Sequence, residues 1–204
     1  MRPAAARIRE RPPSDVLGQV LAAATENVRA TMDNVSAETF QRAVARLADR
    51  KRRVFVLAGE IARGVGIAFV TKLDLLREGV VAIGGSPVRV ARQLADLDDG
   101  DVVVVIEHRR YERWLLEVLD RAHDRGASAI ALTDSTLSPV ATAAECVFVV
   151  DAHGAGPFDS HVGTLALLEA LAAGVAARLR RSATTRLDAI EASWASGNEL
   201  VDHL

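Results

Sequence analysis

Residues 103–116 read VVVIEHRRYERWLL, and the fold can be deduced from the change from apolar to charged residues within this stretch. Together with Val102, its first part forms an apolar, β-branched run without alternation, which is typical of a strand buried on both faces of a parallel sheet. The polar turn at residues 107–111 ends the run, and a helical pattern follows directly. The stretch therefore predicts a strand, a turn and a helix in immediate succession.

The same unit recurs along the chain. Four more short apolar runs predict strands at residues 54–57, 80–83, 129–132 and 147–150. Helical patterns lie between or after the strands, at residues 61–78, 87–97, 111–125, 137–144 and 158–181. This alternation predicts an α/β fold, a three-layer αβα sandwich around a five-stranded parallel sheet. The last helix is apolar over most of its circumference, which favours contact with a partner subunit as well as with the sheet.

Residues 1–50 precede the predicted sheet domain of residues 51–204. Residues 1–13 contain four arginines and three prolines, which predicts a disordered arm or linker, with a nucleic-acid-binding arm as the alternative. Residues 14–50 predict a helical segment that packs on the domain, with one helix starting at Ser14 and another at Ser36. Both serines are good N-cap residues.

Composition excludes several classes of protein. The chain has 204 residues, the size of one domain, and a net charge of −2, which argues against a dedicated nucleic-acid binder. No apolar run reaches the roughly 20 residues of a membrane span, and the start of the chain lacks the apolar core of a signal peptide. Cys146, the single cysteine, lies in an apolar run and is expected to be buried. We therefore expect a cytoplasmic protein without membrane contact.

Ligands of open α/β sheets bind beyond the carboxyl ends of the strands, so three loops are candidates: residues 58–63, 107–111 and 133–136. The glycines at 59, 64 and 66 lack the Lys-Ser/Thr ending of a P-loop and are better explained by close helix–sheet packing. His153 and His161 do not have a recognised metal-ligand spacing. We therefore predict neither a metal site nor a cofactor.

From about Asp15 onward the chain resembles the sugar isomerase (SIS) domain of MurR/RpiR-family transcriptional regulators. The resemblance rests on residues 53–59, on 102–106 with the following turn, on 125–134 with Ser138-Pro139, and on 158–160. It implies a flavodoxin-like strand order, a homodimer or higher oligomer, and an effector that is a phosphosugar or sugar acid. It also implies that DNA would be contacted only through a helix-turn-helix domain, which this chain does not contain.

The binding motifs depart from the family pattern. In typical SIS domains a serine in the first loop and an S-x-S-G-x-T turn in the third loop hold the sugar phosphate. These positions fall here on Ala62 and on residues 108–111, where no serine remains. Hydroxyl groups are thus replaced by positive charge. Guanidinium groups bind phosphate or carboxylate in a bidentate manner, so we expect Arg63, Arg109 and Arg110 to converge on an anionic effector.

The predicted effector site combines these arginines with polar neighbours in the same loops and at the start of the last helix. Its residues are Gly59, Glu60, Arg63, His108, Arg109, Arg110, Tyr111, Thr133, Ser135, Asp159 and Ser160. The alternative is that Glu60, Glu107 and Asp159 neutralise the arginines in surface salt bridges, which imply no ligand. The pocket would then be degenerate and the domain a ligand-free dimerisation module.

Isomerase activity would require a base that moves a proton between adjacent carbons. Glu60, His108 and Glu169 are the candidates. Because the usual anchor for the phosphate is missing, the binding energy that supports catalysis is reduced. We therefore expect a non-catalytic, effector-binding domain without catalytic residues, and a phosphosugar aldose–ketose isomerase remains the alternative.

Overall fold

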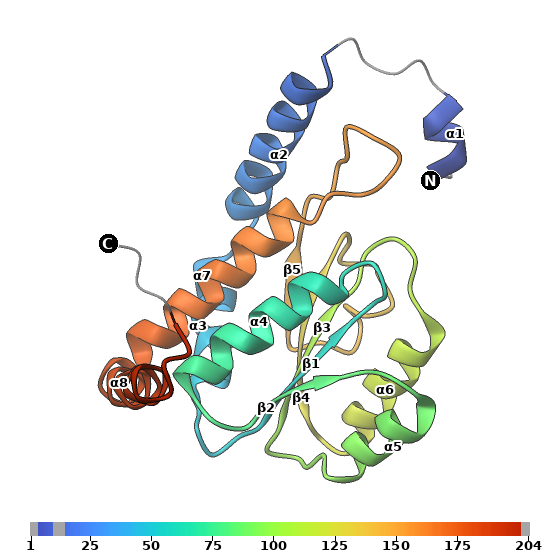
Figure 1. Ribbon diagram of the computed structural model, residues 1–204. Helices are drawn as coiled ribbons and strands as arrows, with labels where there is room; N and C mark the ends of the chain where they lie inside the picture. The colour runs from blue at the N-terminus through green and yellow to red at the C-terminus, as the bar shows by residue number, and fades with distance from the viewer. Residues whose placement is uncertain (1–3, 10–14, 201–204) are drawn as a thin grey trace.

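The computed structural model of the protein describes residues 4–9 and 15–200. Five parallel strands form one sheet in the order β2-β1-β3-β4-β5 (Figure 1). The strands are β1 (Val54–Ala58), β2 (Val80–Ile83), β3 (Val102–Ile106), β4 (Ser128–Thr133) and β5 (Cys146–Val149). The predicted five-stranded parallel sheet and its flavodoxin-like order are confirmed.

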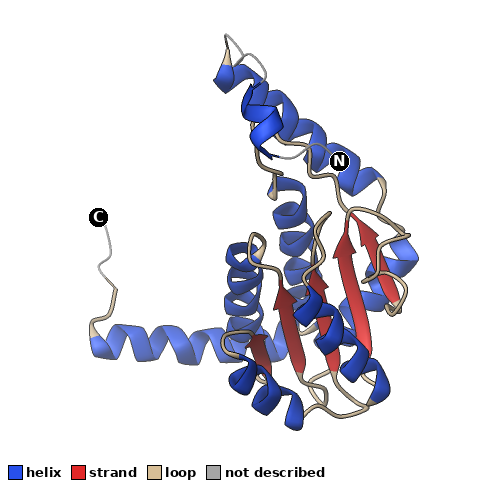
Figure 2. Cartoon of the chain, turned by 90° about the vertical axis from the view of Figure 1, so that its right-hand side faces the viewer, coloured by secondary structure: helices blue, strands red, loops and turns tan. Residues whose placement is uncertain are grey.

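Helices cover both faces of this sheet (Figure 2). The helices are α1 (Ala4–Arg9), α2 (Val16–Asp33), α3 (Ala37–Ala48), α4 (Arg63–Leu76), α5 (Pro87–Ala95), α6 (Arg113–Asp124), α7 (Val162–Arg178) and α8 (Arg180–Gly197). Successive β3 side chains alternate between two cores, because neighbouring strand residues point to opposite faces. Val102, Val104 and Ile106 join the core beneath α3, α4 and α7, whereas Val103 and Val105 join the core beneath α5 and α6. The three-layer sandwich is therefore confirmed.

The apolar circumference of α7 is explained within the chain. Helix α7 packs against α2, α3 and α4 as well as the sheet core, so most of its apolar side chains are already covered. Contact of α7 with a partner subunit stays a prediction, and its exposed large apolar side chains are those of Val162 and Leu165, at 42% and 38%. The predicted helix at residues 158–181 also begins later, at Val162, and ends at Arg178, where the chain bends by 102° into α8.

Two other segments differ from the sequence-based expectation. Residues 137–144 form turns instead of a helix, because the Ser138 hydroxyl accepts the N–H of Ala141 at 3.2 Å and bonds Thr133 Oγ1 at 3.0 Å. Local bonds of this kind compete with the helical pattern. The expected disordered arm contains a helix, α1, and Ser14 lies outside the described residues. The side chain of Asp15 instead caps α2 by accepting the N–H of Gly18.

Within residues 4–9 and 15–200 no single helix is long and apolar enough to cross a membrane. Only α7 and α8 taken together meet the length and composition required, and they are strongly bent at their junction.

Candidate functional site

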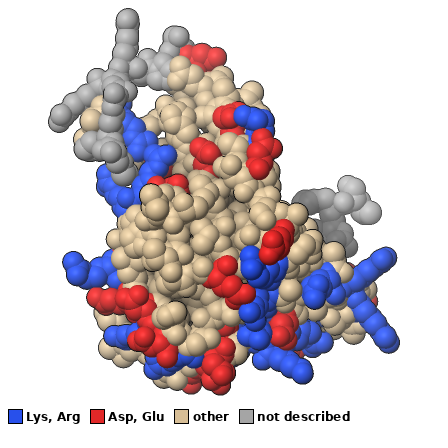
Figure 3. Space-filling view, turned by 180° about the vertical axis from the view of Figure 1, so that it is seen from behind, with Lys and Arg blue, Asp and Glu red and all other residues tan. Residues whose placement is uncertain are grey.

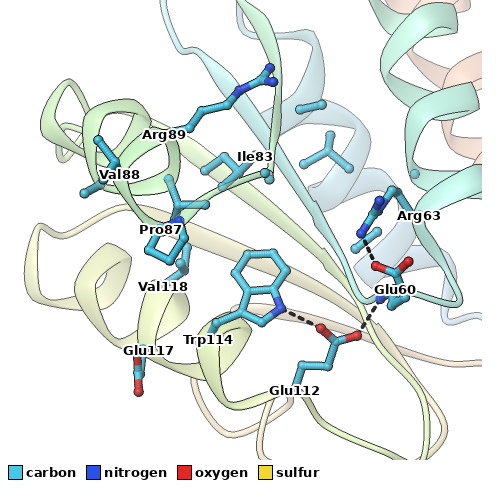
Figure 4. A pocket seen from close by; sticks show the side chains of 18 of the residues that line it. Glu60, Arg63, Ile83, Pro87, Val88, Arg89, Glu112, Trp114, Glu117 and Val118 are labelled. Atoms are coloured by element: carbon cyan, nitrogen blue, oxygen red, sulfur yellow. Dashed lines mark hydrogen bonds and ion pairs between the residues drawn. The ribbon is translucent and has the colours of Figure 1, made fainter.

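A cavity of about 880 Å³ opens beside the carboxyl ends of β1 and β2 (Figure 4). Its walls come from the loop after β1, the start of α4, the start of α5 and the first turns of α6. The chain leaves β1 toward one face of the sheet and β3 toward the other, so the strand order reverses between β1 and β3, whereas the cavity lies on the β2 side of β1. We call this cavity the crevice. It shares with the usual ligand sites of open α/β sheets the carboxyl edge of the sheet.

Three arginines, Arg63, Arg89 and Arg121, and three glutamates, Glu60, Glu112 and Glu117, line the crevice. Arg63 forms an ion pair with Glu60, and both side chains are well exposed. Arg89 and Arg121 also line the cavity, and neither has an ion-pair partner among the described residues. Both arginines can therefore bind an anion without first breaking a salt bridge.

An aromatic ring lies among these charges. Trp114 is held in place because its indole N–H donates to Glu112, whose carboxylate also accepts the backbone N–H of Glu60. These two bonds connect α6 to the loop after β1 across the crevice (Figure 4). Pro87 and Val118 provide apolar surface near the ring. The crevice thus combines a ring, an apolar wall and guanidinium groups, which is a lining suited to a small amphipathic anion.

The turn after β3 lies beyond this crevice and is fastened to neighbouring elements. Arg109 has a φ of 59°, an uncommon value for a residue with a side chain. Its backbone N–H donates to Asp134 at 3.0 Å, and its guanidinium forms a 2.9 Å ion pair with Asp159. The hydroxyl of Tyr111 donates to the same Asp134 oxygen at 2.7 Å. Although burial favours the protonated form, these hydrogen bonds outweigh it and lower the pKa of Asp134.

Glu107 begins this turn as a buried acid. It is 6% exposed, and Oε2 has no hydrogen-bond partner, whereas Oε1 accepts the backbone N–H of His108 at 3.1 Å. Burial is the main reason that its pKa rises from 4.5 to about 7. Gly59 makes room for the carboxylate, because a Cβ at position 59 would collide with Oε2. Gly59 therefore has a packing role beside Glu107, and its part in the effector site stays a prediction.

The imidazole of His108 points into the protein. It is 7% exposed, its Nε2 lies 3.3 Å from Thr164 Oγ1 on α7, and its ring centroid is 5.2 Å from that of His161. Burial, followed by the neighbouring His161, lowers the pKa of His108 to about 4. Burial also lowers the pKa of His161. Both rings are therefore neutral at neutral pH and belong to a buried polar cluster.

The eleven residues predicted from the sequence thus separate into groups. Glu60 and Arg63 line the crevice, whereas the other nine do not line it. Ser135 and Ser160 accept the backbone N–H groups of Leu137 and Val162, and so stabilise turns. The nine are Gly59, His108, Arg109, Arg110, Tyr111, Thr133, Ser135, Asp159 and Ser160.

The three predicted arginines do not converge. Arg63 is paired with Glu60 and Arg109 with Asp159, as the salt-bridge interpretation expected, while Arg110 is exposed. Arg89, Arg121 and Trp114 were missed. The available signal was the Gly-Gly-Ser-Pro turn at residues 84–87, which follows the second strand.

The SIS domain model matches residues 46–174, which is more than half of the chain, and the chain therefore belongs to the SIS domain family. A solved relative is the sugar isomerase domain of an RpiR transcription factor from Sphaerobacter thermophilus. It is 29% identical with a TM-score of 0.78, and the match covers 87% of this chain and 99% of that one.

Two other solved structures share the fold and contain sugar derivatives. The NanR protein of Vibrio vulnificus, complexed with ManNAc-6P, is 17% identical with a TM-score of 0.74, over 90% of this chain and 70% of that one. A protein of Escherichia coli CFT073 in complex with A5P is 14% identical with a TM-score of 0.71, over 86% of this chain and 95% of that one. No curated protein matches the sequence.

Proposed function

We propose that this SIS domain binds an anionic carbohydrate derivative, a phosphosugar or sugar acid, in the crevice and acts as the sensor of an RpiR-type transcriptional regulator in the cytoplasm. The observation that carries the proposal is the pair of arginines, Arg89 and Arg121, which line the crevice with Trp114 and have no ion-pair partner among the described residues. Guanidinium forks suit phosphate and carboxylate, and an aromatic ring suits the apolar face of a sugar. The complexes of two structural neighbours with ManNAc-6P and A5P support this class of ligand.

We further propose that binding is not followed by isomerisation. Of the three candidate bases, Glu60 is occupied by an ion pair with Arg63, and Glu169 pairs with Lys72 on the surface. His108 is buried beside Thr164 and does not line the crevice. A general base must lie within hydrogen-bond reach of the proton that it removes. None of the three is both free of an ion pair and directed into the crevice.

Thermal unfolding across a panel of sugar phosphates and sugar acids tests the binding proposal. A ligand at 100 times its Kd adds about 2.7 kcal/mol to the free energy of unfolding, which shifts Tm by several degrees. Arg89→Ala and Arg121→Ala should each reduce this shift. Arg110→Ala is the matched control, because Arg110 is exposed outside the crevice. If the ligand-induced thermal shift were lost in Arg110→Ala but kept in the other two variants, the binding site would lie at the turn after β3 and not in the crevice.

The same panel separates a sensor from an isomerase. We expect each compound to be recovered unchanged after incubation with the protein. Interconversion of an aldose and a ketose would contradict the sensor proposal, and its loss in Glu60→Gln would identify the base. A panel without any thermal shift would leave the fold as a dimerisation module.

We propose, in addition, that the chain forms a homodimer through the exposed end of α2. The residues of α2 that are buried are polar: Asn27 bonds the backbone of His153, and Thr31 accepts the N–H of Asp151. Its first turns show the reverse, because four large apolar side chains are between 50% and 84% exposed there. They are Val16, Leu17, Val20 and Leu21.

This apolar end suits a second copy of the chain. Residues 16–25 contain no charged side chain, and α2 projects beyond the body of the domain (Figure 1). An uncharged apolar patch can pack on its own symmetry mate around a twofold axis. Sedimentation analysis should show a dimer for the native chain and a folded monomer for Leu17→Glu with Leu21→Glu. A monomeric native chain would contradict the proposal.

A further inference from the structure

A second cavity, of about 770 Å³, lies at the opposite end of the sheet from the crevice. It is bounded by the end of α4, the turn after α3, and the junction at which α7 passes into α8. These segments lie beyond the amino ends of β1 and β2, so this cavity shares no lining residue with the crevice. We call it the junction pocket.

Five arginines line the junction pocket, against one carboxylate, that of Glu78. Two of the five are already engaged. Arg77 is 1% exposed and donates to backbone carbonyl groups, including that of Leu47 at 2.6 Å and that of Asp49 at 3.0 Å. Arg186 forms ion pairs with Asp74 and Glu78. These two arginines therefore stabilise the fold, and the only carboxylate of the lining is already shared.

The other three arginines are available for a ligand. Arg50, Arg178 and Arg181 are exposed, and within residues 4–9 and 15–200 their guanidinium groups make neither an ion pair nor a hydrogen bond. They come from two segments far apart in the sequence, the turn after α3 and the α7–α8 junction. Figure 3 shows arginine and lysine side chains projecting at the right edge of the face in view, with others along its left edge. Three unpaired cations around one cavity repel one another, so a bound anion would relieve that repulsion.

The remaining lining gives the pocket an apolar part. Leu76, Leu179 and Ile190 are half-buried and line it together with Ala189. A cavity of several hundred Å³ with apolar walls and a few charged groups has the size and chemistry of a small-molecule site. Duplex nucleic acid requires a broader basic surface, and the chain as a whole carries a net charge of −2.

We propose that the junction pocket binds a small organic phosphate. Its phosphate group would be held by Arg50, Arg178 and Arg181, and its apolar part would lie against Leu179 and Ile190. This site is independent of the effector proposed for the crevice, because the two cavities lie at opposite ends of the sheet and have separate linings.

Isothermal titration calorimetry with phenyl phosphate and with inorganic phosphate, at constant ionic strength, tests the proposal. We expect saturable binding of one phenyl phosphate per chain, tighter than that of inorganic phosphate. Arg50→Ala, Arg178→Ala and Arg181→Ala should each raise Kd by about 1.5- to fivefold, the range of exposed ionic contacts. Arg180→Ala is the control, because Arg180 is a neighbouring exposed arginine that is not part of the lining.

Three results would overturn the proposal. The first is the absence of saturable binding to the native chain. The second is an equal loss of affinity in Arg180→Ala and in Arg181→Ala, which would indicate a diffuse surface charge. The third is loss of phenyl phosphate binding in Arg89→Ala, which would place the ligand in the crevice. Circular dichroism of each variant controls for folding.

Discussion

Replacement of Glu107 by glutamine should change how the stability of the protein depends on pH. The carboxylate is buried, one of its oxygens has no hydrogen-bond partner, and its pKa rises from 4.5 to about 7 because burial disfavours the charged form. The folded protein therefore binds a proton that the unfolded chain has already released between these two pH values. Stability that is fully present below pH 4.5 is lost as the pH rises through about 7.

The size of this loss follows from the two pKa values. The interval between 4.5 and about 7 is 2.5 pH units. One pH unit corresponds to 1.36 kcal/mol, so ionisation of Glu107 should remove about 3 kcal/mol of stability by pH 8. Glutamine keeps the shape and can still accept the N–H of His108, but it does not ionise. The Glu107→Gln variant should therefore become more stable relative to the native chain, by about 3 kcal/mol, between pH 4.5 and pH 8.

Urea unfolding of both proteins at half-unit steps of pH measures this difference directly. Other titrating groups contribute equally to both chains and cancel in the difference. His108, whose pKa burial lowers to about 4, is present in both proteins and cancels in the same way. A difference in stability that stays constant from pH 4.5 to pH 8 would refute the reasoning, because Glu107 would then ionise as freely in the folded as in the unfolded chain.

Three further predictions concern packing and ion pairs. Arg77→Met should lower the free energy of unfolding by at least about 3 kcal/mol, because several buried carbonyl groups would lose their donor; a loss below 1 kcal/mol in urea unfolding would contradict this. Gly66→Ala should lower the free energy of unfolding by about 1–3 kcal/mol, because the added Cβ would lie 2.8 Å from that of Ala58. Gly64→Ala should raise it by up to about 1 kcal/mol, because a Cβ at that position meets nothing within 4 Å. Equal Tm values for the two variants would contradict this prediction. Asp159→Asn should lower the free energy of unfolding by about 1 kcal/mol at low salt, because Arg7 and Arg109 both pair with this carboxylate. The loss should be smaller in 1 M NaCl, and a loss that does not depend on salt would exclude an ionic origin.

The sheet could be predicted because parallel strands are buried on both faces and so appear as unbroken apolar runs. Each β3 residue from Val102 to Ile106 is fully buried. The helix predicted at residues 137–144 was wrong because the Ser138 hydroxyl holds a turn, an effect that apolar periodicity does not report. The apolar circumference of α7 was visible, but a sequence does not show whether such a helix is covered by its own chain or by a partner.

The site was only partly predictable for a related reason. The pairing of Arg63 with Glu60 follows from their spacing of three residues, and both line the crevice. Arg89 lies on the helix after β2, and it lines the same cavity as Trp114 only because β2 is the neighbour of β1 at the edge of the sheet. The adjacency of β2 and β1 depends on the strand order. The loop after the second strand therefore carried a signal that could be used only once the sheet topology was known.

Fluorescence titration of a Trp194→Phe variant tests the central claim most directly. The chain contains two tryptophans, so Trp114, which lines the crevice, would be the only one left to report. We expect a saturable change in its emission with at least one sugar phosphate or sugar acid, and a weaker response when Arg89 is replaced by alanine. Emission that no such anion alters, in a variant that remains folded, would contradict the proposal that the crevice binds an anionic sugar derivative.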